Sequence, residues 1–188
     1  MAVEKIQYQA GSVTGHGALV WNEKVSGKRP LLLVMPNWLG VTDIVVKRAA
    51  KMAGDNYIAF VADMYGNGKT SEGPPESQEL MMAVRKDRVE GRKRVNAALN
   101  SLVAEANKRG IGDASRKAAV GFCFGGGNVL ELARSGANWQ MLDFGLRVHS
   151  FTEEETMMPG MAEYHAGAAH QTYRMLEDFI QDAFNKKL

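Results

Sequence analysis

Short apolar runs alternate along the chain with longer segments that have the spacing of amphipathic helices. The runs at 30–36, 57–63 and 117–122 are continuously apolar, as expected for strands buried on both faces of a sheet. A shorter run at 15–21 predicts an edge strand, and 139–145 predicts a fourth buried strand. Because helical segments separate the runs, the pattern predicts βαβ units and a mostly parallel sheet covered by helices on both faces.

The helical segments are bounded by capping residues and by glycines. They are expected from Thr42 or Asp43 to Ala53 with Gly54 as the stop, over 76–109 with a break near Gly91, over 127–135, and over 161–185. Ligands of such sheets bind beyond the carboxyl ends of the strands. Asn37, Cys123 and His149 all follow predicted strands, so they are candidates for one pocket.

Composition restricts the class of protein. The 188 residues favour a single domain over 1–188, and the formal charge of +2 gives no indication of a nucleic-acid partner. The one cysteine, Cys123, forms no internal disulfide, which fits a reducing, cytoplasmic environment. The N-terminus lacks the apolar stretch of a signal peptide, and no run is long enough to span a bilayer. No metal or cofactor is expected.

Cys123 stands in the stretch "VGFCFGG", between a predicted strand and a predicted helix. This spacing is typical of a nucleophile elbow, in which glycines on either side prevent a clash between strand and helix. A helix N-terminus stabilises an anion and so lowers the pKa of a thiol. The backbone N–H groups of Phe124 and Trp38 are the expected donors of an oxyanion hole. The alternative is a structural cysteine in a glycine-rich turn.

Two other segments are similar to ligand-binding motifs but lack part of the pattern. "GNGKTS" at 66–71 lacks the first glycine of a phosphate-binding loop, because position 63 is Asp63, and no helix begins after it. "RKDRVEGRKR" at 85–94 mixes acids with its arginines and lysines at helical spacing, which favours a solvated helix face over a nucleic-acid surface.

The elbow, together with "LLLVMPNWLGVTD", "YIAFVADMYG" and the C-terminal "VHSFT", resembles the dienelactone hydrolase family, a cysteine branch of the α/β-hydrolases. The resemblance implies a three-layer α/β-hydrolase-like sandwich and hydrolysis of small carboxylic esters or lactones without a metal. It also implies a Cys–His–Asp triad in which Cys123 is the nucleophile and His149 the base. The expected partner is a small-molecule ester or lactone.

The sequence departs from the family at two places. Asn37 stands where the family commonly has a glutamate that helps to activate the thiol, and an amide accepts no proton at neutral pH. No arginine follows His149 in "SFTEEE", so specificity for a dienelactone is not implied.

The larger departure is in length. His149 follows Cys123 by only 26 residues, whereas the family fold needs a strand, an acid loop, a helix and a final strand there, on the order of 50 residues. Residues 137–139 mark the expected seam of a shortened fold, unless a stretch of the protein is missing from the printed chain at that point. Asp143, inside the predicted strand, is not assigned as the triad acid, which stays unknown.

These departures leave two further functions open. A shortened homologue with weak or no catalysis would have a structural or binding role. A redox-sensitive thiol protein would also use Cys123, although the chain offers no second, resolving cysteine.

Overall fold

The computed structural model describes residues 1–134, 140–141, 147, 149–155, 157–158 and 160–187. It contains two compact units, Met1–Ser135 and Gly136–Leu188, and each is described here by itself. The single domain expected over 1–188 stays a prediction. The strand predicted at 139–145 and the seam at 137–139 lie outside the described residues, apart from Gln140 and Met141.

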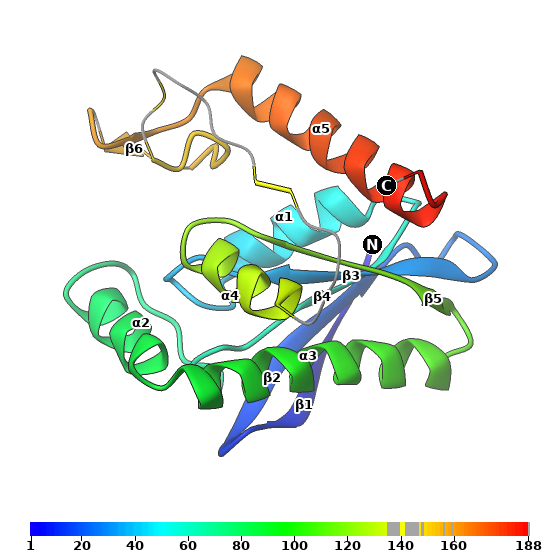
Figure 1. The fold of residues 1–188 in the computed structure, drawn as a ribbon, viewed down its shortest axis with the longest axis horizontal. Coiled ribbons are helices and arrows are strands. Elements are labelled where there is room, and N and C mark those ends of the chain that lie inside the picture. Colours follow the sequence, from blue (N-terminus) through cyan, green and yellow to red (C-terminus); the bar gives the residue numbers. More distant parts are fainter. Residues whose placement is uncertain (135–139, 142–146, 148, 156, 159, 188) are drawn as a thin grey trace. The chain divides into compact units, whose positions relative to one another are not determined.

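A five-stranded sheet forms the centre of the first unit (Figure 1). Its strands are β1 (Ala2–Ala10), β2 (Val13–Trp21), β3 (Arg29–Met35), β4 (Ile58–Val61) and β5 (Gly112–Gly121), in the spatial order β1-β2-β4-β3-β5. β3 pairs in parallel with β4 and β5, whereas β2 pairs antiparallel with β1 and β4. The predicted parallel core is therefore present, but the described sheet is mixed.

The prediction that the run at 15–21 forms an edge strand is wrong. β2 lies between β1 and β4, and β1 lies at the edge. β1 was not predicted because charged and amide side chains interrupt it. Ile6 and Tyr8 are partly buried against the core, and Ala10 at its end is buried. Charged residues on an edge strand oppose pairing with another chain.

Side-chain caps start α1 and one of the two helices in the segment at 76–109. In α1 (Asp43–Ala53) the Thr42 hydroxyl accepts a hydrogen bond from the Val45 N–H at 3.4 Å, and the helix ends at Gly54 as predicted. The segment at 76–109 is two helices, α2 (Glu76–Lys86) and α3 (Arg88–Lys108). The break lies at Asp87 rather than Gly91, because the Asp87 carboxylate accepts from the Glu90 N–H at 2.9 Å and starts a new helix.

Helices cover both faces of the sheet, so the first unit has the predicted three layers (Figure 1). Leu31, Leu33 and Met35 of β3 pack with the buried residues of α3. Side chains alternate along a strand, so Leu32 and Val34 point to the opposite face. The buried stripe of α1, formed by Val45, Ala49 and Ala53, covers that face.

The second unit contains a small hairpin and a long helix. β6 (Met157–Met158) pairs antiparallel with β7 (Ala162–Glu163), and α5 (Ala166–Phe184) follows. α5 begins five residues later than predicted because His165 caps it, with its Nδ1 accepting from the Ala168 N–H at 3.0 Å. Among the described residues, no helix is long and apolar enough to cross a membrane.

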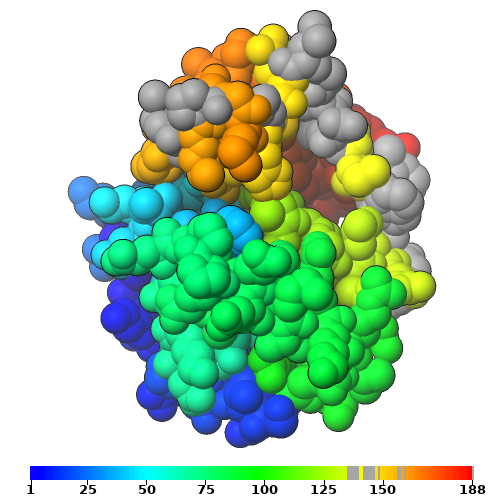
Figure 2. All heavy atoms as spheres, turned by 90° about the vertical axis from the view of Figure 1, so that its left-hand side faces the viewer, coloured from blue at the N-terminus to red at the C-terminus, as the bar shows by residue number. Residues whose placement is uncertain are grey.

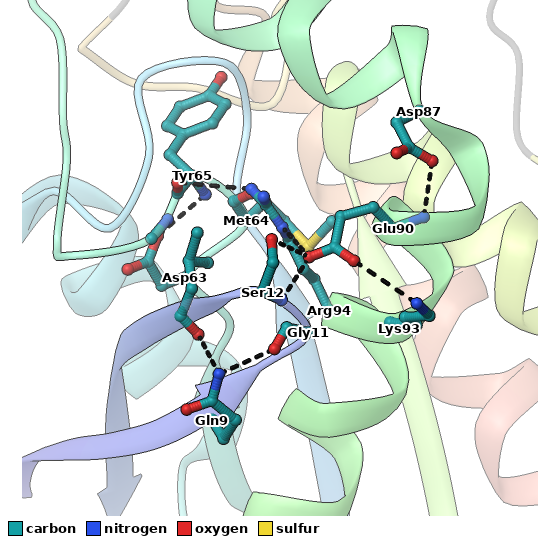
Figure 3. Close-up of polar contacts among 12 residues, drawn as sticks. Gln9, Gly11, Ser12, Asp63, Met64, Tyr65, Asp87, Glu90, Lys93 and Arg94 are labelled. Carbon is teal, nitrogen blue, oxygen red and sulfur yellow. Dashed lines mark hydrogen bonds and ion pairs between the residues drawn. The ribbon is translucent and has the colours of Figure 1, made fainter.

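Glu90 of α3 holds the turn between β1 and β2 (Figure 3). Its carboxylate accepts hydrogen bonds from the Ser12 N–H at 2.6 Å and the Ser12 hydroxyl at 2.7 Å. Arg94 Nε lies 3.4 Å from the same carboxylate oxygen, Oε1. The bonds from Ser12, followed by that from Arg94, lower the pKa of Glu90 from 4.5 to about 2. The charged carboxylate therefore stabilises the junction of β1, β2 and α3.

Glu90→Gln is expected to lower the free energy of unfolding at pH 7. A carboxylate with a depressed pKa stabilises the fold above its unfolded-state pKa of 4.5, and that contribution is lost as the pH falls toward about 2. Urea unfolding of wild type and variant should show a difference at pH 7 that narrows at acid pH. Glu23→Gln, in the exposed loop after β2, is the control, and a difference independent of pH would contradict the assignment.

Candidate active site

Cys123 occupies a strained turn between β5 and α4 (Phe124–Ala133). Its backbone has φ 56° and ψ −123°, a conformation that residues with a Cβ rarely adopt. The thiol side chain is exposed. Strain of this kind persists only where the surrounding structure enforces it, and it is the geometry of a nucleophile elbow.

The glycines beside Cys123 allow α4 to approach the sheet backbone directly. A Cβ on Gly125 would lie 2.2 Å from the Met35 carbonyl oxygen at the end of β3. A Cβ on Gly121 would lie 2.3 Å from the Gly125 carbonyl carbon and oxygen. Both distances are far inside van der Waals contact. The glycine spacing therefore has the packing role predicted for it, and it brings the elbow against the end of β3.

The helix after Cys123 begins earlier than predicted. α4 starts at Phe124 instead of residue 127. Three consecutive glycines are unfavourable in an isolated helix, but Gly125 packs on the end of β3 and Gly126 on Gly121 of β5. Phe124 is buried and is the first helical residue. Its N–H is therefore one of the helix-terminal donors that have no partner within the helix.

The loop after β3 forms a tight turn over residues 37–40. The Gly40 N–H donates to the Asn37 carbonyl at 3.3 Å, and the Leu39 N–H donates to Asn37 Oδ1 at 3.0 Å. In a trans peptide the N–H points opposite to the carbonyl, so the Trp38 N–H points away from the turn. Asn37 is buried, and its side-chain carbonyl thus shapes the loop that carries Trp38.

The two N–H groups predicted for the oxyanion hole belong to loops that lie together. Gly125 packs on Met35 and Pro36, so the start of α4 lies beside the start of the 37–40 turn. Neither the Trp38 N–H nor the Phe124 N–H donates to an acceptor in the part of the chain that the structure describes. N–H groups that have no acceptor among the described residues are suited to donate hydrogen bonds to an oxyanion.

His149 lies in the second unit, in the segment before β6. Its N–H donates to the Met161 carbonyl at 3.1 Å, and its carbonyl accepts from the Glu163 N–H at 3.1 Å. These bonds fix its backbone beside β7, while its side chain is exposed. Its assignment as the base stays a prediction, and Asp143 lies outside the described residues.

Two residues that the sequence analysis did not assign to the site hold the loop after β4. The buried Asp63 carboxylate accepts hydrogen bonds from the N–H groups of His16, Tyr65, Gly66 and Gly68 at 2.8–3.0 Å. Within "GNGKTS", the N–H groups of Gly66 and Gly68 thus donate to Asp63. The Tyr65 hydroxyl donates to the Trp38 carbonyl at 2.8 Å. An aspartate followed by glycines is a signal for such a turn.

The basic side chains of the run at 85–94 have two different positions. Arg85, Arg88 and Arg92 line a surface pocket, whereas Arg94 points into the protein interior. Figure 2 shows α2 and the start of α3, in green, on one face of the first unit with the start of α4, in yellow-green. A pocket of about 320 Å³ between them is lined by Arg85, Arg88, Arg92 and Glu131 among others. Arg92 lies 2.9 Å from Glu131 and is the main cause of the lowered pKa of that carboxylate. Arg94 turns inward and donates to the Met64 carbonyl at 2.9 Å.

No group of three or more His, Cys, Asp or Glu side chains within the described ranges could hold a metal ion.

Gly125→Ala and Gly127→Ala form a matched pair that tests the packing of the elbow. At Gly125 the new methyl meets the Met35 carbonyl, whereas at Gly127 it meets nothing within 4 Å. Gly125→Ala should lower the free energy of unfolding by ~2 kcal/mol or more. Gly127→Ala should leave it unchanged or raise it by up to ~1 kcal/mol, because alanine favours a helix. Chemical denaturation measures both, and equal effects would show that the close approach is not needed.

Comparisons with known proteins find a matching family and solved structures with a similar fold. The family model for the dienelactone hydrolase family matches residues 16–141. A solved structure named m3DLH is 27% identical, with a TM-score of 0.86, and the match covers 97% of this chain and 98% of that one. The dienelactone hydrolase-like promiscuous phosphotriesterase P91 from metagenomic libraries is 26% identical, with a TM-score of 0.85 and the same coverage.

A cold-adapted esterase from an Arctic intertidal metagenomic library shares the fold over 71% of this chain and 56% of its own, with 14% identity and a TM-score of 0.54. A search of curated protein sequences gives no match. The family match spans β2 to α4 and includes the Cys123 elbow and the Trp38 loop. The chain belongs to the dienelactone hydrolase family, whose members are hydrolases with the α/β-hydrolase fold.

Proposed function

We propose that the protein hydrolyses small carboxylic esters or lactones, with Cys123 as the nucleophile and a thioester as the intermediate. The observation that supports this most is the backbone of Cys123, which is held at positive φ between β5 and α4 with its side chain exposed. Membership of a hydrolase family agrees with this chemistry. Nothing in a purely structural turn requires a Cβ-bearing residue at this strained position, where glycine would fit at lower cost.

The first half of the reaction forms the acyl-enzyme. The Cys123 thiolate attacks the carbonyl carbon, and the carbonyl π electrons move to oxygen, which becomes an oxyanion. The N–H groups of Trp38 and Phe124 donate hydrogen bonds to that oxyanion. When the carbonyl re-forms, the carbon–oxygen bond to the alcohol breaks, and the alkoxide takes a proton from the protonated His149. A lactone keeps the alcohol attached to the same acyl chain.

The second half releases the acid. His149 accepts a proton from water, and the hydroxide equivalent adds to the thioester carbonyl. The tetrahedral intermediate expels the Cys123 thiolate, so that the carboxylic acid leaves and the enzyme is restored. Asn37 takes no proton in this scheme, because an amide has no basic site at neutral pH. Its part is to shape the turn that presents the Trp38 N–H.

The name of P91 suggests a second class of substrate for the same thiol. P91 is described as a promiscuous phosphotriesterase. An aryl dialkyl phosphate is therefore a useful second substrate, because it also offers an electrophilic centre with an oxygen that gains charge. Turnover of this substrate by wild type would extend the proposal to phosphotriesters.

Wild type is expected to turn over p-nitrophenyl acetate, and Cys123→Ala and Cys123→Ser are expected to lose at least ~1,000-fold in kcat/KM. Rapid quenching followed by intact-protein mass spectrometry should show one added acetyl group on wild type. Because Cys123 is the only cysteine, wild type blocked with iodoacetamide is the control for the loss of the thiol.

The outcomes of this experiment separate the three functions. Turnover that survives in Cys123→Ala would refute the assignment of Cys123 as the nucleophile. Stable acetylation of wild type without turnover would favour a weak or inactive homologue. Ready oxidation of Cys123 by peroxide, with neither acetylation nor turnover, would favour a redox-sensitive thiol protein.

His149→Ala should slow the release of the acyl group more than its formation, because water needs a base whereas an activated p-nitrophenyl ester has a good leaving group. Stopped-flow measurement should therefore show a burst of nitrophenolate followed by a steady state at least ~100-fold slower than that of wild type. His170→Ala, an exposed histidine on α5, is the matched control. Identical steady-state rates for His149→Ala and His170→Ala would refute the assignment of His149 as the base.

A further inference from the structure

Tyr65 contacts both residues that carry the expected oxyanion-hole donors. Its hydroxyl donates to the Trp38 carbonyl at 2.8 Å. Its ring stacks on the Phe124 ring, with 5.8 Å between the centroids and 13° between the planes. Trp38 follows β3 and Phe124 follows β5, so one side chain from the loop after β4 joins two segments that are far apart in the sequence.

The peptide between Trp38 and Leu39 is held on both sides. Its carbonyl accepts the hydrogen bond from the Tyr65 hydroxyl, and its N–H donates to Asn37 Oδ1 at 3.0 Å. A planar peptide bonded at both polar groups has little freedom to rotate. The neighbouring peptide, which carries the Trp38 N–H, is fixed by the bond from the Gly40 N–H to the Asn37 carbonyl. The direction of the Trp38 N–H thus depends on a turn that Tyr65 anchors.

The ring of Phe124 is held in the same way. Phe124 is 2% exposed and is the first residue of α4. Stacking on Tyr65 fixes one face of its ring, and the close packing of Gly125 on Met35 fixes the backbone that follows. A stacked aromatic pair stabilises the positions of both rings beyond simple burial of their surface. The position of the Phe124 N–H therefore also depends on Tyr65.

Tyr65 is itself held rigidly by the first unit (Figure 3). Its N–H donates to the buried Asp63 carboxylate at 3.0 Å. Arg94 donates to the carbonyls of Met64 at 2.9 Å and Tyr65 at 3.4 Å. Burial, with a smaller contribution from the nearby charge of Cys123, raises the pKa of Tyr65, so its hydroxyl stays a donor at any working pH.

We propose that Tyr65 is a positioning residue that sets the relative direction of the Trp38 and Phe124 N–H groups for binding of the oxyanion. The proposal rests on the proposed function, because the oxyanion forms only when Cys123 attacks a carbonyl. Oxyanion-hole donors act mainly in the transition state. Both acylation and hydrolysis of the thioester pass through an oxyanion, so loss of the Tyr65 contacts should slow both steps without weakening the binding of the ester.

Tyr65→Phe tests this directly, because it keeps the stacked ring and removes only the hydrogen bond to the Trp38 carbonyl. We expect kcat for p-nitrophenyl acetate to fall by about 10-fold, with KM changed by less than ~2-fold. Alkylation of Cys123 by iodoacetamide forms no oxyanion, so its rate should stay within ~2-fold of wild type. A general loss of structure would change both rates.

Tyr8→Phe is the matched control. The Tyr8 hydroxyl accepts from the Asp63 N–H at 3.0 Å, so the variant removes a tyrosine hydrogen bond at the start of the same loop. Tyr8 lies on β1 and makes no contact with the Trp38 turn in the described hydrogen-bond network. Its kcat should stay within ~2-fold of wild type. If Tyr65→Phe does not fold, Phe124→Leu removes the stacking from the other side and should give the same split between acylation and alkylation.

The results distinguish this proposal from the proposed function. Wild type that is never acylated would overturn both. Wild type that is acylated, with Tyr65→Phe acylated equally fast, would overturn only the role of Tyr65. A fall in kcat matched by an equal fall in the alkylation rate, or shared by Tyr8→Phe, would assign Tyr65 to loop stability instead.

Discussion

The direct contact between the backbone of α4 and the backbone of β3 and β5 determines most of the site. No side chain fits at Gly121 or Gly125, because a Cβ there would lie within 2.3 Å of backbone atoms. The chain must therefore pass from strand to helix within two residues, Phe122 and Cys123, and Cys123 adopts a strained backbone with φ 56°. With this contact the Cys123 thiol is exposed, and the start of α4 lies against the beginning of the loop after β3. The exposed thiol, the position of the helix terminus and its contact with the loop after β3 therefore follow from one packing constraint.

The buried carboxylate of Asp63 supports this arrangement from the neighbouring loop. It accepts four backbone N–H groups and so replaces the regular secondary structure that the loop lacks. Leaving such donors unpaired in the interior would cost about 1–3 kcal/mol each. The polar groups that shape the site, Asp63, Asn37 and Arg94, bond mainly to backbone atoms, and through them they position the loops that carry Tyr65 and Trp38.

Sequence patterns were informative where apolar runs and glycines recur at fixed spacing. β3, β4 and α1 lie where the pattern placed them, because continuous burial and a side-chain cap leave a local signal. β1 left no such signal, since an edge strand with charged residues resembles a loop. The start of α4 was also missed, because three consecutive glycines predict no helix until tertiary packing holds them. Similarly, the break between α2 and α3 lies at Asp87, whose side chain caps α3, and not at Gly91, where the sequence predicted it.

The sequence by itself determined the fold class, the family resemblance and the elbow around Cys123, because each depends on residues close together in the chain. Only the tertiary structure decided that Tyr65 contacts both Trp38 and Phe124, since these contacts join the ends of three different strands. It also decided that Asn37 shapes a turn, a role that an amide at that position does not reveal in the sequence. Local spacing encodes the strained turn, whereas the direction of each donor depends on the packing of distant segments.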